Sequence, residues 1–394
     1  MKFFLDQYGT VISTERAKEL KFNELSKKLV QLDSTLPDVS IAPAIAEDPK
    51  PPKSHIHIRG DFFQPGIEVR PGVLAALHPF PADEKPTRLT LARWIVSQDN
   101  PLTARVAVNR IWQELLGRGL VTTSEDFGTQ GERPSHPELL DWLAADFRDH
   151  GWSLKRTIKQ VVMSPTYRQS SKARPELQER DPDNRLLARQ NRLRLPGELI
   201  RDVTLAASGL LDTRVGGRSV KPPQPPGVAE LGYSNSVKWI ESKGADVYRR
   251  GLYVHFQRTA PYPFLMNFDA PSSNVTACRR ERSDTPLQAL NLLNDPVFSE
   301  AAQALAARLL TEVSGEFDRR REYAYRLCLA RPPPSEQAEM WQYFRKQTQL
   351  LEDDPKAAEA LFPASGIGAN RVESAAWMGL SSLLLNLDEF ITRE

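Results

Sequence analysis

Three arginines around a glutamate form the stretch of this chain best suited to bind a charged ligand. Arg279, Arg280 and Arg282 follow Cys278 and surround Glu281. We call residues 279–282 the arginine segment. Guanidinium groups beside the free N–H groups at the start of a helix create a geometry that receives anions. The segment therefore predicts a ligand site in which the three arginines hold negative charge.

A helix-start signal follows the arginine segment directly. Ser283, Asp284 or Thr285 can cap the helix, and Pro286 suits its first position because the missing N–H would be unpaired there. Asp284 and Thr285 join the ligand-site candidates because they fix this start. We expect the leucines to form the buried face and the amides to remain polar: Leu287, Leu290, Leu292 and Leu293 against Gln288 and Asn291.

The same arginines could instead lock the fold by pairing with internal acids. Acids such as Asp269, Glu281 and Asp295 could serve as these partners. Ion-pair networks imitate functional sites, so the sequence leaves both interpretations open. They differ in what the removal of Arg280 would do. A lock would leave a carboxylate unpaired and destabilise the protein, whereas a site would lose its ligand.

Three further side chains are weak candidates for catalysis. His55 and Asp269 have groups able to transfer protons. Cys278 precedes two arginines, which would stabilise a thiolate and suit a nucleophile or a redox residue. A reactive cysteine also needs a base, and the sequence places none beside it. The catalytic residues are therefore unknown at this stage.

A His-x-His pair lies on a predicted strand over residues 54–59. Alternation places His55 and His57 on one face of that strand, which is a plausible metal half-site. A third ligand such as Asp61 would have to come from the fold. The simpler interpretation is a polar strand face, so we predict no metal site and keep the two histidines as weak candidates.

Aromatic residues lead into the arginine segment. Residues 249–257 predict a buried strand, and Arg250 in it is a further ligand-binding candidate. Rings can stack on the apolar faces of sugars while arginines hold acidic substituents, although such rings are more often core residues. The aromatic residues concerned are Tyr253, Phe256, Tyr262, Phe264 and Phe268.

The composition excludes several classes of partner. The 394 residues carry a net charge of only +2, which gives no global field for nucleic acid or an anionic membrane. A local basic stripe is interpreted as internal salt bridges. It comprises Arg185, Arg189, Arg192, Arg194 and Arg201, with Asp181, Asp183, Glu198 and Asp202 as expected partners. No apolar run reaches the roughly 18 residues of a membrane span. The two cysteines exclude a disulfide scaffold, and without Cys-x-x-Cys-His no cofactor is expected in this chain.

Periodicity and capping signals predict a mainly α fold, a multi-helix domain with a small β element and long Pro-rich loops. Residues 1–53 should form an amphipathic helical arm, periodic over 11–33, and a proline-rich linker. Residues 54–394 should form the domain. The β element is built from 54–59 and 249–257 with the arginine segment beside it, and 212–247 form a long loop or lid. The predicted helices are Leu89–Val96, Thr103–Leu116 (ended by Gly117), His136–His150 (capped by Ser135), Leu154–Met163 (capped by Ser153), Leu199–Leu211, Ala301–Thr311, Phe317–Leu329, Glu336–Leu351 and Arg371–Leu387.

Several long phrases in order resemble a known family. They include His-Ile-His-Ile-Arg-Gly-Asp-Phe, Asn-Pro-Leu-Thr-Ala-Arg-Val-Ala-Val-Asn-Arg-Ile-Trp, Glu-Asp-Phe-Gly-Thr-Gln-Gly-Glu and Arg-Arg-Glu-Arg-Ser-Asp-Thr-Pro-Leu-Gln-Ala-Leu. From about His55 onward, the chain resembles the planctomycete-type domain of unknown function 1553. That domain forms the C-terminal half of large planctomycete proteins, often together with a cytochrome-c-like module. Cys278 fits the family phrase, whereas His57 departs from it.

The resemblance implies an exported, multidomain parent, with upstream family domains as partners and haem c in an upstream module only. The chain shows no signal peptide, so we expect a fragment or a misplaced start, and an extracytoplasmic location rests on the resemblance alone. The leading hypothesis is a module that binds or processes an anionic or carbohydrate ligand such as a polysaccharide. The alternative is a structural or interaction domain without catalysis.

Overall fold

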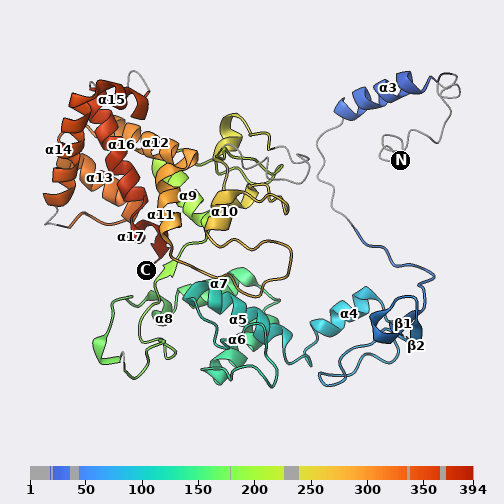
Figure 1. Ribbon diagram of the computed structural model, residues 1–394. Helices are drawn as coiled ribbons and strands as arrows, with labels where there is room; N and C mark the ends of the chain where they lie inside the picture. The colour runs from blue at the N-terminus through green and yellow to red at the C-terminus, as the bar shows by residue number, and fades with distance from the viewer. Residues whose placement is uncertain are drawn as a thin grey trace. The chain divides into compact units, whose positions relative to one another are not determined.

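The computed structural model describes residues 18, 21–35, 44–177, 179–225, 239–334, 338–363 and 370–393 (Figure 1). The chain divides into two compact units, Met1–Ser54 and His55–Glu394. Within the first unit, helix α3 (Phe22–Thr35) overlaps the amphipathic stretch predicted over 11–33. Parts of four predictions lie outside the described residues. They are the start of that stretch, residues 36–43 of the predicted arm and linker, residues 226–238 of the predicted loop, and the first two residues of the helix expected from Glu336.

The second unit is mainly α, as predicted. Its described helices are α4 (Arg88–Ile95), α5 (Thr103–Leu116), α6 (Pro137–Asp149), α7 (Leu154–Val162), α8 (Pro165–Arg168), α9 (Gly197–Ser208), α10 (Pro263–Asn267), α11 (Pro286–Asn294), α12 (Pro296–Glu312), α13 (Phe317–Leu329), α14 (Ala338–Asp353), α15 (Pro355–Leu361), α16 (Arg371–Leu385) and α17 (Asp388–Ile391). Short 3-10 turns occur at Ile58–Gly60, Pro175–Leu177, Gly244–Tyr248 and Gly251–Tyr253. None of the helices in the described residues is long and apolar enough to cross a bilayer.

Local capping signals explain the ends of several helices. Helix α5 ends where predicted, because Gly117 takes the left-handed conformation at φ 83°. The Ser153 side chain accepts a hydrogen bond from the Arg156 N–H and caps α7. The cap predicted for α6 is wrong: His136, not Ser135, is the N-cap residue, and Pro137 begins the helix.

The small β element is present, but its predicted pairing is wrong. Strand β1 (Ser54–His57) pairs with β2 (Pro65–Val69), and β3 (Leu193–Arg194) pairs with β4 (Thr392–Arg393). Residues 249–257 do not form a regular strand. They contain the turn Gly251–Tyr253 and take part in two isolated bridges, Asp212 with Arg249 and Val220 with Val254.

Two hydrophobic cores hold the second unit together. The larger core centres on α12 and α16, which pack against each other beside α14 (Figure 1). Leu305 of α12 and Leu380 of α16 are fully buried there. The smaller core joins α5, α6 and α7 through Trp112, Leu140 and Val161. Burying each such side chain contributes about 1.5–3 kcal/mol.

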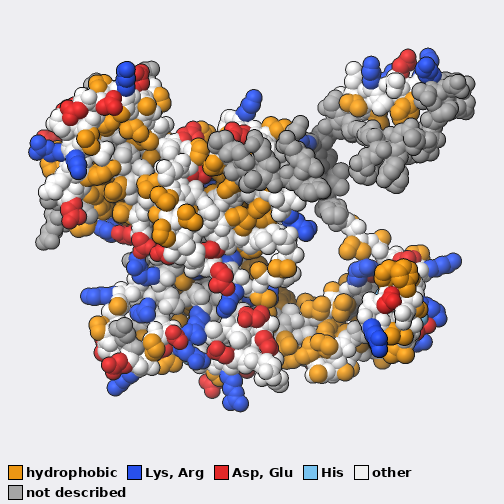
Figure 2. Space-filling model, in the orientation of Figure 1, with side chains coloured by type: hydrophobic (Ala, Val, Ile, Leu, Met, Phe, Trp, Pro, Cys, Tyr) orange, Lys and Arg blue, Asp and Glu red, His pale blue; other side chains and the backbone are white. Residues whose placement is uncertain are grey.

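Hydrophobic side chains also remain on the surface. Figure 2 shows them over the β1–β2 hairpin and α4, where Phe62, Phe63 and Ile67 are exposed. The hairpin therefore contributes little to either core.

Candidate functional site

One face of α9 carries two carboxylates, and the other face belongs to the larger core. Glu198 and Asp202 are four residues apart, so their side chains lie on the same side of the helix. Ile200 and Leu205 are fully buried in the core. The helix therefore fixes both carboxylates on a rigid support.

A groove of about 450 Å³ opens over this face. The volume falls in the range of roughly 300–1,000 Å³ typical of ligand sites. Its polar lining comprises Glu198, Asp202, Arg250, Ser273 and Arg280, and its apolar lining includes Leu199, Leu252, Val254, Phe256, Leu265 and Pro271. The groove thus has charged groups and apolar surface within one hollow.

Arg280 from the arginine segment grips Glu198 with both terminal nitrogens. The two hydrogen bonds are 2.8 and 2.9 Å long, a bidentate pair between residues 82 apart in sequence. Burial raises the pKa of Glu198, but hydrogen bonds from Arg280 and from the Glu198 backbone outweigh it and hold the pKa below its ordinary value. The pair is only partly enclosed, with 35% of the Arg280 side chain exposed. Arg280 is therefore matched to an acid and still faces the groove.

Asp202 accepts hydrogen bonds from residues 250 and 251, in the segment 247–251 that packs against α9. The Arg250 Nε donates to one carboxylate oxygen at 2.9 Å, and the Gly251 backbone N–H donates to the other at 2.6 Å. The hydrogen bond to Asp202 raises the pKa of Arg250. A Cβ at Gly251 would lie 2.6 Å from the Glu198 Cα, so only glycine permits this approach.

A buried arginine on α9, Arg201, fixes the backbone of segment 247–251. Arg201 is 1% exposed and donates to the backbone carbonyl oxygens of Val247, at 2.5 Å, and Arg249, at 3.4 Å. Burial lowers the pKa of Arg201, while Tyr262, Asp202 and Asp295 counteract this. A guanidinium stays charged even so. It therefore fixes the backbone that carries Arg250 and Gly251.

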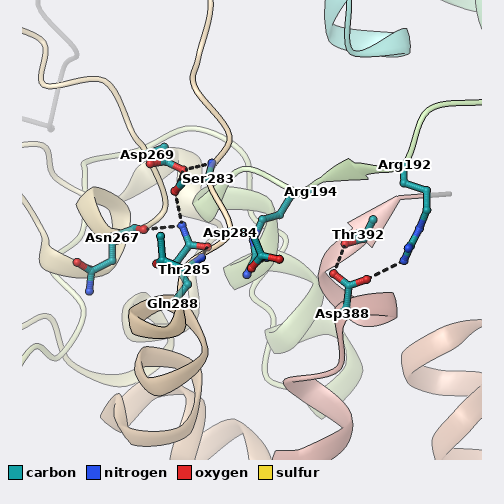
Figure 3. Close-up of polar contacts among 10 residues, drawn as sticks. All are labelled: Arg192, Arg194, Asn267, Asp269, Ser283, Asp284, Thr285, Gln288, Asp388 and Thr392. Atoms are coloured by element: carbon teal, nitrogen blue, oxygen red, sulfur yellow. Dashed lines mark hydrogen bonds and ion pairs between the residues drawn. The ribbon is translucent and has the colours of Figure 1, made fainter. Parts of the chain in front are cut away.

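The start of α11 is fixed by a network around Asp269, shown in Figure 3. One Asp269 oxygen accepts hydrogen bonds from both the N–H and the Oγ of Ser283, each at 2.7 Å. The Gln288 amide donates to the Asn267 carbonyl at 2.8 Å and to the Ser283 Oγ at 3.1 Å. As predicted, α11 has Thr285 as its N-cap and Pro286 in its first turn. The Asp269 carboxylate thus orders the turn before α11.

The predicted buried face of α11 is largely wrong. Leu292 is 4% exposed, but Leu287, Leu290 and Leu293 are exposed. Gln288 is buried beside Leu292, because its amide donates to the Asn267 carbonyl and the Ser283 hydroxyl.

The remaining arginine pairs correct the partners expected from sequence. Arg282 pairs with Glu114 on α5 at 3.3 Å, a partner that the sequence did not predict. Arg279 pairs with Glu281 at 3.6 Å, and Glu281 was among the expected acids. Asp295 does not pair with the arginine segment. Its side chain caps α12 through the Val297 N–H, and burial raises its pKa.

Among the described residues, three of the five arginines of the basic stripe form internal ion pairs as predicted, but with acids other than those expected. Arg194 pairs with Asp284 at 2.6 Å, and Arg192 with Asp388 at 2.7 Å (Figure 3). Arg185 lies 4.0 Å from Glu132. Arg201, described above, bonds to backbone carbonyls.

Cys278 and the two histidines lie apart from the groove lining. The Cys278 Sγ accepts from the Arg110 guanidinium at 3.7 Å, and a guanidinium does not act as a base. No group of three or more His, Cys, Asp or Glu residues within the described residues could hold a metal. Within those residues, the structure records no contact that joins His55 or His57 to Asp269 or to the arginine segment. Cys328 packs against the core, and burial raises the pKa of its thiol to about 12.

Of the five aromatic residues, three lie in the core, one lines the groove and one stacks on an arginine. Tyr262, Phe264 and Phe268 are buried in the larger core, and Tyr253 lies under the Arg249 guanidinium at 3.7 Å. Phe256 lines the groove. Sequence reasoning missed Glu198 and Asp202 as groove residues. Their four-residue spacing was the available signal, but the predicted helix began only at Leu199, after Glu198, and the arginines opposite come from distant segments.

The chemistry available in the groove is hydrogen bonding by ionised groups. Glu198 is an acceptor held in its charged form, because its pKa is lowered. A general acid needs the opposite shift, toward a pKa near the working pH. The geometry therefore suits the binding of hydroxyl groups better than proton donation.

Comparison with known proteins identifies a family and no reaction. No curated protein and no solved structure matches the chain. A family model described as PSD1, protein of unknown function (DUF1553), matches residues 87–344. This match spans more than half of the chain and confirms the family expected from the sequence phrases. The chain therefore belongs to the DUF1553 family.

Proposed function

We propose that the groove over α9 binds a saccharide. The observation that carries this proposal is the pairing of charges along one side of the groove. Arg280 is paired with Glu198 and Arg250 with Asp202, so two cations are balanced by two carboxylates. Charged groups arranged in this way offer hydroxyls both donors and acceptors without a large net charge.

The apolar lining supports the same ligand class. Phe256, Leu252 and Pro271 line the groove together with the charged pairs. A sugar ring carries hydroxyl groups at its edge and C–H groups on its faces. It can therefore satisfy the charged groups and cover the apolar surface at once.

A glycan array probed with the purified chain, followed by isothermal titration calorimetry on the strongest ligand, tests the proposal. Phe256→Ala and Leu252→Ser should each weaken binding by about tenfold, since each removes apolar contact surface. Leu154→Ser on α7 is the control, because Leu154 is 56% exposed and lies outside the groove lining. Failure of a folded protein to bind any saccharide would contradict the proposal.

The bidentate Arg280–Glu198 pair also favours a second function, a structural or interaction domain whose arginines lock the fold. In that case Arg280→Ala would lower the free energy of unfolding and no saccharide would bind. Under the saccharide proposal, the same variant loses affinity for the saccharide as well. Calorimetry and urea denaturation of one variant therefore separate the two functions.

We further propose that the chain serves as a C-terminal module of an exported, multidomain protein, with haem c confined to an upstream module. The family resemblance supports this proposal. Fractionation of the source cells with an antibody against the chain tests it. Recovery of the protein in the cytoplasmic fraction would contradict export.

A further inference from the structure

A second, smaller hollow adjoins the groove. Its volume is about 10 Å³, which accommodates about one water-sized atom. Arg280 and Pro196 line both the hollow and the groove. The hollow and the groove therefore share part of their lining beside Arg280.

Three guanidinium groups surround this hollow: Arg194, Arg280 and Arg282. The Arg194 Nε is buried and has no hydrogen-bond partner among the described residues. The acid paired with Arg194 is Asp284, whose side chain is 78% exposed, so water competes for that contact. Arg194 thus retains a donor in a place where an acceptor would be favourable.

The cations are crowded here. Burial lowers the pKa of Arg282, Glu114 counteracts this, and the neighbouring Arg393 and Arg280 lower the pKa further. A negative charge placed among these groups would relieve their mutual repulsion.

The two carboxylates in the lining are directed to other partners. The Asp269 Oδ2 accepts two hydrogen bonds from Ser283. The Glu281 side chain is 80% exposed and pairs with Arg279 at 3.6 Å. Neither group forms an ion pair with Arg194 or Arg282 within the described residues, where Arg194 is paired with Asp284 and Arg282 with Glu114.

We infer that this arginine hollow receives one oxygen of an acidic group on a saccharide whose ring lies in the groove. The ligand class is an acidic saccharide, which carries a carboxylate or a sulfate. This inference rests on the proposed function and narrows it, because paired charges in the groove alone do not select an acidic sugar.

Calorimetry with matched oligosaccharides tests the inference. The probes are an oligogalacturonate, a sulfated oligosaccharide, a neutral oligosaccharide of equal length, and inorganic sulfate at the same ionic strength. We expect one of the acidic saccharides to bind at least about tenfold more tightly than the neutral one, the difference expected for a charge-assisted hydrogen bond. Which acidic saccharide gains affinity distinguishes carboxylate from sulfate.

Variants assign that preference to the hollow. Arg282→Gln and Arg194→Gln should remove the preference for acid while they leave binding of the neutral saccharide unchanged. Arg282→Lys keeps the charge and should retain part of the preference. Arg326→Gln, at an α13 side chain that is 63% exposed, is the control with unchanged preference.

The outcomes separate this inference from the proposed function. Equal binding of neutral and acidic saccharides would overturn the inference and leave the proposed function intact. Binding of inorganic sulfate as tightly as the acidic saccharide would overturn it as well, because the saccharide would then add nothing. The absence of any saccharide binding would overturn both.

Discussion

At the residue scale, the Glu198–Arg280 pair makes the free energy of unfolding depend on pH. The pKa of Glu198 in the folded protein lies below its ordinary value of 4.5. A carboxylate whose pKa is depressed on folding stabilises the protein above its unfolded pKa, and this contribution is lost as the pH falls through the folded pKa.

We therefore expect Glu198→Gln to lower the free energy of unfolding by about 1–2 kcal/mol near neutral pH, between the effects of exposed and buried pairs. The difference from wild type should shrink as the pH falls below 4.5. Urea denaturation at a series of pH values measures this. Glu322→Gln in the more exposed pair with Arg326 is the control. A difference that does not change with pH would show that the carboxylate charge plays no part.

Gly251 gives a second prediction at this scale. A Cβ there would meet the backbone of Glu198 at 2.6 Å, and backbone cannot move aside as a flexible side chain can. Gly251→Ala should therefore cost about 1–3 kcal/mol in unfolding free energy and distort the groove. Gly72→Ala is the matched control, since its Cβ would lie 4.0 Å from the Arg70 carbonyl oxygen, an ordinary contact distance. Equal stability of the two variants in urea would contradict the close approach.

Sequence alone could not assign the arginine partners. Arg282 and Glu114 are 168 residues apart, and Arg280 and Glu198 are 82 apart. Only Arg279 and Glu281, two positions apart, could be paired from the sequence. Charge identified the arginines as important, but the fold decides which acids meet them.

At the element scale, predictions succeeded where local signals suffice. Helix α13 spans Phe317–Leu329 as predicted, and α5 ends at its glycine cap. The strand predicted over 249–257 failed because its hydrophobic pattern is satisfied differently. Val254 enters the core, while the backbone of Val247 and Arg249 bonds to the Arg201 side chain. The Arg201 side chain and two isolated backbone bridges, to Asp212 and Val220, thus take the place of a regular neighbouring strand.

Helix α9 supports the backbone of residues 247–251 through Arg201, and this support can be tested. Arg201→Met keeps much of the buried volume but removes the donors to two carbonyls. It should lower the free energy of unfolding by about 1–3 kcal/mol. It should also speed amide hydrogen exchange around residue 251, because Arg201 holds the backbone that precedes Gly251. Arg326→Met is the control, and unchanged exchange in Arg201→Met would show that Arg201 does not support this segment.

At the scale of the whole molecule, the larger core decides whether the second unit folds. Leu305→Ala, at a fully buried position on α12, should lower the free energy of unfolding by about 2–5 kcal/mol. Leu287→Ala on α11 should change it by less than about 0.5 kcal/mol, since that side chain is 67% exposed. Urea denaturation of both variants measures the contrast. A similar loss in both would mean that α11 is covered in solution.

The two faces of α9 have a practical consequence for finding the ligand. One face of this helix belongs to the larger core and the other to the groove. A compound that binds the two carboxylates should therefore also stabilise the core against thermal unfolding. Saturation at about 100 times the dissociation constant adds about 2.7 kcal/mol to the folded state. A dye-based thermal-shift screen of unlabelled sugars would therefore detect occupancy of the groove before any reaction is known.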